Sequence, residues 1–208
     1  MQLKGAINMG HIVLLGDSIF DNESYVNRDE DVTAHLRKII QKDFKVTLCA
    51  VDGAMIDGIS RQVERIPEDA SDLFLSIGGN DVLQYKNILT NNTLTALEFL
   101  TNFADVLDKF KDRYKKMVTS LLKFDLPLRV CTIYNGNLEQ DLVKPARVTV
   151  ALFNDIIYQI AGEYNLPVIE LRYICTESSD YANPIEPSSF GGRKIAQAIN
   201  NIVKNIEF

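Results

Sequence analysis

A serine at position 18 has a setting that suits a nucleophile. It follows Gly16 and Asp17 at the end of the apolar segment 12–15. A turn at this point would lift the hydroxyl above the edge of a sheet, where it could attack a substrate. Aspartate and serine also close ordinary turns through local hydrogen bonds. Ser18 therefore predicts chemistry only if suitable partners lie near it.

Two further residues could act together with Ser18. A serine that attacks an acyl group needs hydrogen-bond donors for the oxygen that becomes negative, and a backbone amide in a glycine loop or a short side-chain amide can supply them. Gly53 and Asn80 each follow a later apolar segment. A turn that needs positive φ would equally explain Gly53, and a helix cap would equally explain Asn80. The argument therefore depends on whether the chain brings all three residues together.

Short apolar segments alternate with longer segments of helical periodicity, which is typical of βαβ units in a parallel sheet. The predicted strands are residues 11–15, 45–50, 72–77, 128–134 and 167–171. The predicted helices are residues 32–41, 96–123, 143–164 and 193–206, the second of them with a break. Ligands bind at the carboxyl ends of such strands. Ser18, Gly53 and Asn80 all follow predicted strands, so we expect them to share one site.

The length and charge of the chain narrow the class of protein. Its 208 residues suit a single domain spanning positions 1–208. The net charge of −6 provides no positive field for a nucleic-acid partner. No apolar run reaches the ~20 residues of a membrane helix, so we expect no membrane insertion and a cytoplasmic protein. The pattern leaves the oligomeric state open. Three widely spaced cysteines are expected to be buried thiols: Cys49, Cys131 and Cys175.

The segments that carry Ser18, Gly53 and Asn80 resemble the sequence blocks of the SGNH hydrolases, also called the GDSL esterase/lipase family. Gly16-Asp17-Ser18 followed by Asp21 is similar to the first block of that family, and Gly53 is similar to the glycine of the second. The third block, Gly-x-Asn-Asp, is matched by Gly78-Gly79-Asn80-Asp81. The resemblance extends over the whole chain in the order of the blocks, but close identity is confined to these short motifs.

This resemblance implies a three-layer α/β/α fold around a doubly wound, five-stranded parallel sheet with flavodoxin-like strand order. It also implies cleavage of carboxylic esters without a cofactor or a metal. Ser18 would be the nucleophile, and the backbone amides of Ser18 and Gly53 with the side-chain amide of Asn80 would form the oxyanion hole. The residues in supporting positions would be Asp17, Asp21, Gly78 and Asp81.

The fourth block departs from the family pattern, Asp-x-x-His-Pro. Glu186 stands where the family has histidine, and Asn183 stands where it has aspartate. A glutamate with an ordinary pKa of about 4.3 is a weaker base than a histidine with a pKa of about 6.5. Burial among Pro184, Ile185 and Pro187 would raise that pKa. We therefore predict that Glu186 is an atypical general base and that the Asn183 amide donates a hydrogen bond to its carboxylate.

The two histidines of the chain are poor candidates for the missing base. His11 precedes Ser18 by seven residues of extended chain, which places it roughly 20 Å away at about 3.3 Å per residue. His35 belongs to the predicted helix over 32–41, which runs back from the first loop. Only an unusual loop would bring it to Ser18.

Other functions remain open on this pattern. The loss of the Asp/His pair also fits an inactive binding domain for an acylated ligand. A flavodoxin-like nucleotide binder shares the sheet, but the first loop lacks the glycines that cradle phosphates. The carboxylates of Asp17, Asp21 and Asp81 could in principle gather around a cation. Expected pocket walls at residues 19–28, 82–89 and 134–142 suit a small-molecule ester with a short acyl chain or an acylated sugar.

Overall fold

A computed structural model describes residues 10–28, 30–40, 44–85 and 94–204. Within these residues, parallel strands form a five-stranded sheet in the order β2-β1-β3-β4-β5, which confirms the predicted doubly wound topology. The strands are β1 (Gly10–Gly16), β2 (Phe44–Leu48), β3 (Asp72–Ser76), β4 (Leu128–Cys131) and β5 (Val168–Ile169). The last strand is shorter than predicted because the chain turns at Glu170 into the short helix α7 (Leu171–Ile174).

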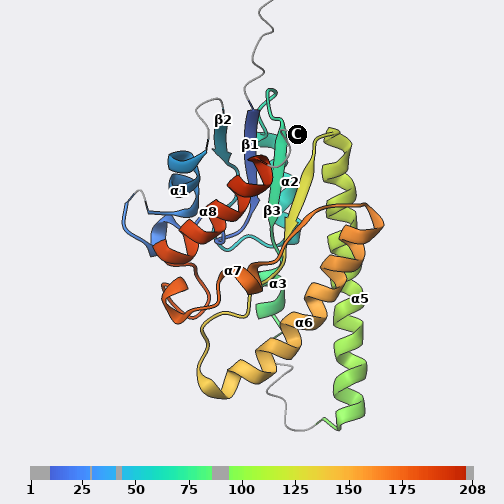
Figure 1. The fold of residues 1–208 in the computed structure, drawn as a ribbon. Coiled ribbons are helices and arrows are strands. Elements are labelled where there is room, and N and C mark those ends of the chain that lie inside the picture. The colour runs from blue at the N-terminus through green and yellow to red at the C-terminus, as the bar shows by residue number, and fades with distance from the viewer. Residues whose placement is uncertain (1–9, 29, 41–43, 86–93, 205–208) are drawn as a thin grey trace, which may run out of the picture.

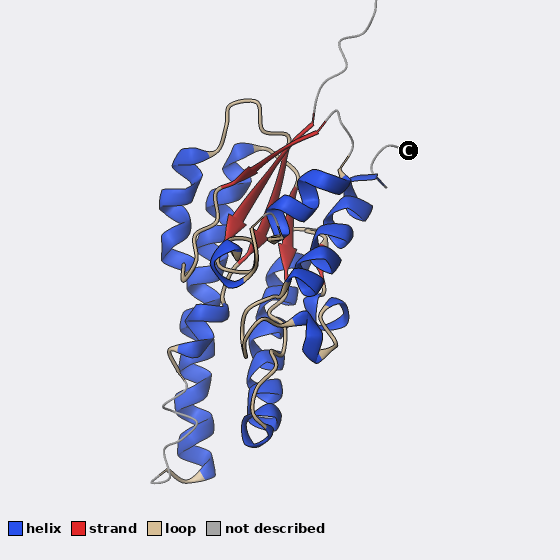
Figure 2. Ribbon diagram, turned by 90° about the vertical axis from the view of Figure 1, so that its left-hand side faces the viewer, coloured by secondary structure: helices blue, strands red, loops and turns tan. Residues whose placement is uncertain are grey.

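Helices cover both faces of the sheet (Figures 1 and 2). Side chains alternate across a strand, so Ile12 and Leu14 of β1 face one side while Val13 and Leu15 face the other. The Ile12 side packs under α1 (Val32–Ile39) and α8 (Ser189–Lys204). The Val13 side packs under α5 (Ala96–Leu121) and α6 (Gln140–Glu163). Because helices cover both faces of β1, residues 12–15 are apolar on both faces of the strand.

The long helices differ in detail from their predicted bounds. Helix α5 starts at a capping box of Thr95 and Glu98 and continues to Leu121, where a 3-10 turn follows, so the predicted break is wrong. Helix α6 starts at Gln140, earlier than the predicted residue 143. The predicted ends of α1 at 41 and of α8 at 206 lie outside the described residues.

The carboxyl edge of the sheet faces the N-terminal parts of α5 and α6, which extend well beyond the strands (Figure 1). Two short helices, α2 (Ile59–Gln62) and α3 (Gly79–Leu83), complete this end. The three cysteines are buried and unpaired, as expected. None of the helices that the structure describes combines the length and apolar character needed to cross a membrane.

Candidate active site

The turn after β1 raises Ser18 above the sheet edge. Gly16 has a φ of +135°, and a Cβ atom on it would lie 1.8 Å from the carbonyl oxygen of Ser76. This close approach lets the Asp17 N–H donate to that oxygen at 3.0 Å. The Asp21 N–H then donates back to the Asp17 carbonyl at 3.1 Å and closes the turn. Glycine is required at position 16 because any side chain would collide with β3.

Gln62 holds this turn from the other side, and sequence reasoning missed it. Its amide accepts a hydrogen bond from the Gly16 N–H at 2.8 Å and donates one to the Gly16 carbonyl at 2.7 Å. The side chain is 1% exposed. Both polar groups of the Gly16 peptide are therefore satisfied inside the protein, as buried backbone groups must be. No local signal marks Gln62, because its partner lies on a distant strand.

The loop that carries Gly53 is held by the third block. The Asn80 side-chain amide donates to the Ala54 carbonyl at 2.9 Å, and the Asp81 carboxylate accepts from the Ile56 N–H at 3.1 Å. An amide nitrogen has two donor protons. Asn80 therefore keeps one proton for the cavity that it lines.

The Gly53 loop is also tied to the Ser18 turn. Asp21 accepts from the Asp52 N–H at 2.8 Å, and the Tyr25 hydroxyl donates to the Asp52 carboxylate at 2.8 Å. Gly53 itself has a φ of +73° and is exposed. The structure thus brings Ser18, Gly53 and Asn80 to neighbouring loops, and Asp21 and Asp81 serve to hold those loops together.

Asp81 is fully buried and faces a cation. Arg113 of α5 lies 2.9 Å from one of its carboxylate oxygens and forms two further hydrogen bonds to Asp57. Burial raises the pKa of Asp81, while the Ile56 N–H and Arg113 lower it. Arg113 was not predicted, since its role arises only when α5 packs against the loop of residues 56–58.

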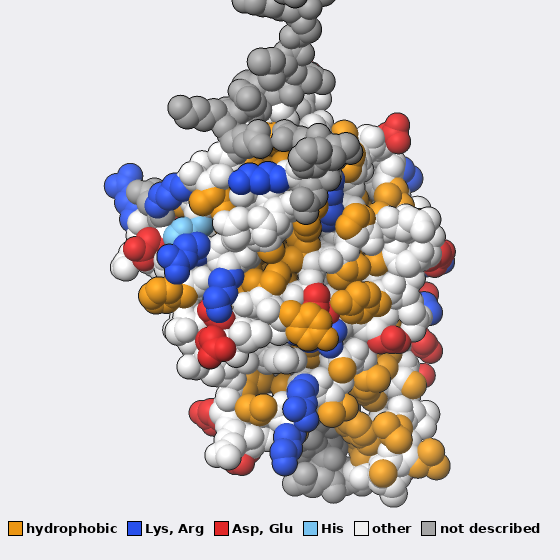
Figure 3. All heavy atoms as spheres, viewed as in Figure 1, with side chains coloured by type: hydrophobic (Ala, Val, Ile, Leu, Met, Phe, Trp, Pro, Cys, Tyr) orange, Lys and Arg blue, Asp and Glu red, His pale blue; other side chains and the backbone are white. Residues whose placement is uncertain are grey.

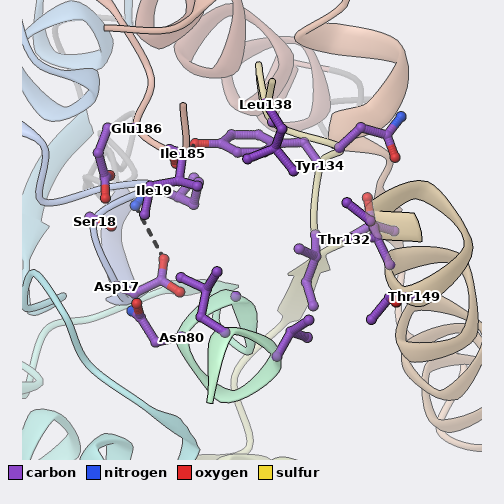
Figure 4. A pocket seen from close by; sticks show the side chains of 18 of the residues that line it. Asp17, Ser18, Ile19, Asn80, Thr132, Tyr134, Leu138, Thr149, Ile185 and Glu186 are labelled. Atoms are coloured by element: carbon purple, nitrogen blue, oxygen red, sulfur yellow. Dashed lines mark hydrogen bonds between the residues drawn. The ribbon is translucent and has the colours of Figure 1, made fainter. Parts of the chain in front are cut away.

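Glu186 lies beside Ser18 at one end of the cavity (Figure 4). Ser18 and Glu186 are 6% and 5% exposed, and both line the cavity. Burial raises the pKa of Glu186, the contact with Ser18 lowers it in part, and the charge of Asp52 raises it again. Among the described residues, Glu186 Oε2 has no hydrogen-bond partner. A buried carboxylate with spare acceptor capacity can take a proton.

Asn183 acts differently from its predicted role. Its side-chain oxygen accepts hydrogen bonds from the backbone N–H groups of Ile185 and Glu186, both at 2.9 Å. The predicted donor contact to the Glu186 carboxylate is replaced by a local turn, which asparagine forms readily because its side chain mimics a backbone carbonyl. Asn183 therefore shapes the loop and leaves the carboxylate to Ser18.

Two residues from elsewhere in the fold hold the same loop. The Asn22 amide donates to the Pro187 carbonyl at 3.0 Å, and the Tyr134 hydroxyl donates to the Ile185 carbonyl at 2.6 Å. Asn22 is fully buried. The carbonyl groups on both sides of Glu186 are thus held by residues that follow two different strands, β1 and β4. These contacts limit the freedom of the Glu186 side chain.

Asp17 provides an unusual carboxyl group next to the nucleophile. Burial raises its pKa to about 8, the nearby charges of Glu186 and Asp81 add to this effect, and a hydrogen bond from the Ile19 N–H opposes it. Asp17 is 3% exposed and lines the cavity. At neutral pH it is mostly a neutral acid, so Glu186 is the carboxylate available to Ser18.

The histidines lie elsewhere, as their positions in the sequence indicated. His11 is bound to Asp69 at 2.8 Å and to Thr47 at 2.7 Å. His35 Nε2 lies 3.1 Å from the Ser189 hydroxyl. For the part of the chain that the structure describes, no group of three or more His, Cys, Asp or Glu side chains could hold a metal ion. The carboxylates considered for a cation are instead bound to protein N–H groups.

A cavity of about 510 Å³ opens beside Ser18. The expected walls contribute through Ile19, through residues 82–85 and through several residues of 134–142, while residues 86–89 lie outside the described residues. The walls from α5 and α6, including Phe103 and Val150, were not predicted. Phe103 lies on the apolar face of α5, and helical periodicity alone does not distinguish a core position from a cavity wall.

Comparison with known proteins identifies this arrangement. A family model described as the GDSL-like lipase/acylhydrolase family matches residues 14–191. That span includes Ser18, Gly53, Asn80 and Glu186. No curated protein matches the chain.

Solved structures of several hydrolases share the fold. The acetyl xylan esterase AlAXEase superposes with a TM-score of 0.69 at 17% identity, covering 93% of this chain and 99% of that one. Phospholipase A1 from Streptomyces albidoflavus NA297 has a TM-score of 0.68 at 14% identity, with 93% and 99% coverage. The extracellular lipase from Streptomyces rimosus has a TM-score of 0.68 at 12% identity, with 92% and 99% coverage. At these identities the likeness concerns the fold.

Proposed function

The chain belongs to the GDSL-like lipase/acylhydrolase family, and we propose that it hydrolyses carboxylic esters with Ser18 as nucleophile and Glu186 as general base. The observation that carries this proposal is that the two buried side chains lie beside each other at one end of the cavity (Figure 4). Geometry is the first requirement for a general base, and a pKa nearer to neutral is the second. The position of Glu186 beside Ser18 and the rise of its pKa on burial both support this role.

In the first half of the reaction, Ser18 attacks the ester carbonyl carbon while its proton passes to the Glu186 carboxylate. The carbonyl oxygen becomes negative, and the amides of Ser18 and Gly53 with the free amide proton of Asn80 are the proposed donors. The tetrahedral intermediate collapses by breaking the bond to the alcohol. The protonated Glu186 gives its proton to the departing alkoxide and returns to the carboxylate form.

In the second half, Glu186 takes a proton from water as the water oxygen attacks the acyl-serine. Collapse of this intermediate releases the carboxylic acid, and Ser18 recovers its proton from Glu186. An aspartate beside the base has no imidazolium to stabilise in such a site. This fits the presence of Asn183, whose neutral side chain organises the loop without adding charge.

An inactive domain that only binds an acylated ligand is the alternative reading of the missing histidine. Such a domain would have no need to exclude water from a serine and a carboxylate. The 6% and 5% exposure of Ser18 and Glu186 favours the hydrolase. Reaction of Ser18 with a fluorophosphonate probe separates the two, because covalent labelling needs an activated hydroxyl.

The decisive experiment measures hydrolysis of p-nitrophenyl esters by Ser18→Ala and Glu186→Gln. Removal of a general base costs about 10²- to 10⁴-fold in kcat, and we expect losses of this size for Glu186→Gln. The matched controls are Ser24→Ala and Glu64→Gln, which alter exposed residues. If the two site variants keep the rate of the unmodified protein, the proposed mechanism is wrong.

A further inference from the structure

The cavity beside Ser18 has charge at one end only. Its charged lining residues are Asp17 and Glu186, and both lie at the nucleophile end with Asn80 (Figure 4). From there the cavity runs between α3, α5 and α6. Its walls in that direction are mainly apolar and include Val82, Phe103, Ile133, Leu142, Ala146 and Val150.

The polar side chains on the lining away from Asp17 and Glu186 include Thr132, Asn135 and Thr149. Thr132 points its hydroxyl at Glu170, to which it donates at 2.7 Å, and it accepts from the Leu171 N–H at 2.9 Å. Its hydrogen-bonding capacity is thus used outside the cavity. A sugar needs several convergent donors and acceptors, and Thr132 is not available as one of them.

Two exposed apolar side chains line part of the cavity. Leu83 and Leu142 line it and are 40% and 50% exposed. Apolar side chains gather over the lower part of the molecule, where α5 and α6 extend beyond the sheet (Figure 3). Exposed apolar side chains at a pocket rim are covered when an apolar ligand enters.

The size of the cavity exceeds what an acetyl group fills. At about 510 Å³ it is roughly three times the ~150 Å³ that accommodates a benzene ring in a protein core. The neutral form of Asp17 at pH 7 keeps charge away from the inner wall, since burial holds its pKa at about 8. An unbranched hydrocarbon chain fits both the shape and the chemistry of this space.

We propose that this cavity is an acyl-chain subsite that selects unbranched acyl groups of about 6 to 12 carbons over acetyl groups and acylated sugars. The inference rests on the proposed function, because the chain would enter from an ester held at Ser18. The sequence predicts a short acyl chain or an acylated sugar, whereas the cavity favours an acyl chain of medium length.

The test uses p-nitrophenyl esters from acetate to dodecanoate. Each buried methylene adds about fourfold to kcat/KM, so we expect a steep rise from acetate to an optimum at medium length. Ala146→Phe places a ring in the cavity from a half-buried position on α6 and should move the optimum to short chains. Val148→Phe adds the same ring to an exposed position on the same helix that is not part of the lining, and the optimum should stay in place.

A binding measurement keeps this inference separate from catalysis. The Ser18→Ala variant is titrated with octanamide and with acetamide, and binding is followed by NMR shifts. We expect octanamide to bind, and Ala146→Phe in the same background to abolish its binding. Binding of octanamide by a protein without esterase activity would overturn the proposed function and support the subsite. An active esterase with a flat chain-length profile, or no octanamide binding, would overturn the subsite.

Discussion

The Glu186 side chain lies beside that of Ser18 at one end of the cavity (Figure 4), although the two residues lie near opposite ends of the chain. Both are buried, and the loops that carry them are joined through Asn22, whose amide donates to Pro187. In the family, the residue at the position of Glu186 is usually a histidine, which acts as the general base. Here a carboxylate occupies that position, and desolvation moves its pKa toward that of a useful base.

This relationship predicts the acidic limb of the pH profile. Glu186 must be ionised to accept the seryl proton, so activity falls as the pH drops through its pKa, which burial raises above the ordinary 4.5. The dependence of kcat/KM on pH reports this value in the free enzyme. Glu186→His should move the limb to about 6.5. A limb at the same pH in both proteins would show that another group is the base.

Asp17 predicts a pH-dependent stability. In the folded protein its pKa is about 8 against 3.8 for an ordinary aspartate, so the folded state keeps a proton that the unfolded chain releases. Its contribution to stability is therefore complete below about pH 4 and is lost as the pH rises toward 8. Asp17→Asn removes this loss, because asparagine stays neutral and its side-chain oxygen can still accept from the Ile19 N–H.

We expect the stability of Asp17→Asn relative to the unmodified protein to increase between pH 5 and pH 8, as measured by urea unfolding. Asp108→Asn, at an exposed position of α5, serves as the control and should shift little. Parallel stability curves for Asp17→Asn and the unmodified protein would contradict the raised pKa.

The buried Asp81 predicts a strong dependence on Arg113. Arg113→Ala leaves the carboxylate without its cation, and breaking a buried pair in this way costs about 3 kcal/mol of unfolding free energy. The double variant with Asp81→Asn should recover part of that loss, because no buried charge is left without a partner. Urea unfolding of the two single variants and the double variant checks this coupling. Strictly additive losses would argue against it.

Asn22 predicts a link between stability and the position of the Glu186 loop. Its side chain accepts from the Val32 N–H at 2.9 Å and donates to the Pro187 carbonyl at 3.0 Å. Asn22→Ala leaves both buried groups unsatisfied, which costs about 2 to 4 kcal/mol in total. Asn22→Asp also loses the donor and places a buried carboxylate against the Pro187 carbonyl, so it should be destabilised as well in chemical unfolding at neutral pH. Equal stability of all three proteins would rule out this bridge.

Two glycines predict opposite outcomes for the same substitution. Gly16→Ala places a Cβ atom 1.8 Å from the Ser76 carbonyl oxygen at a φ of +135°, so we expect little folded protein. A Cβ atom on Gly162 meets nothing within 4 Å in α6, and Gly162→Ala should stabilise the protein by up to about 1 kcal/mol. Thermal unfolding of the two purified variants provides the comparison.

The alternation of strands and helices, and the blocks that lie at the carboxyl edge, could be predicted from the amino-acid pattern. This was possible because buried parallel strands need apolar runs, and because the Gly16 turn needs a residue without a side chain. The pattern also indicated Glu186 as the residue in the place of the family base, since the spacing from Asn183 is local.

The side chains that hold these loops and the residues that line the cavity could be identified only from the packing of the folded chain. Gln62, Asn22 and Arg113 meet partners that are far away in the chain, and a polar residue carries no local sign of such a partner. The direction of the Asn183 side chain depends on the loop conformation. Phe103 and Val150 read as core positions of amphipathic helices, and they line a cavity because α5 and α6 extend past the sheet. Periodicity shows which face of a helix is apolar, whereas packing determines whether that face meets another side chain or an open space.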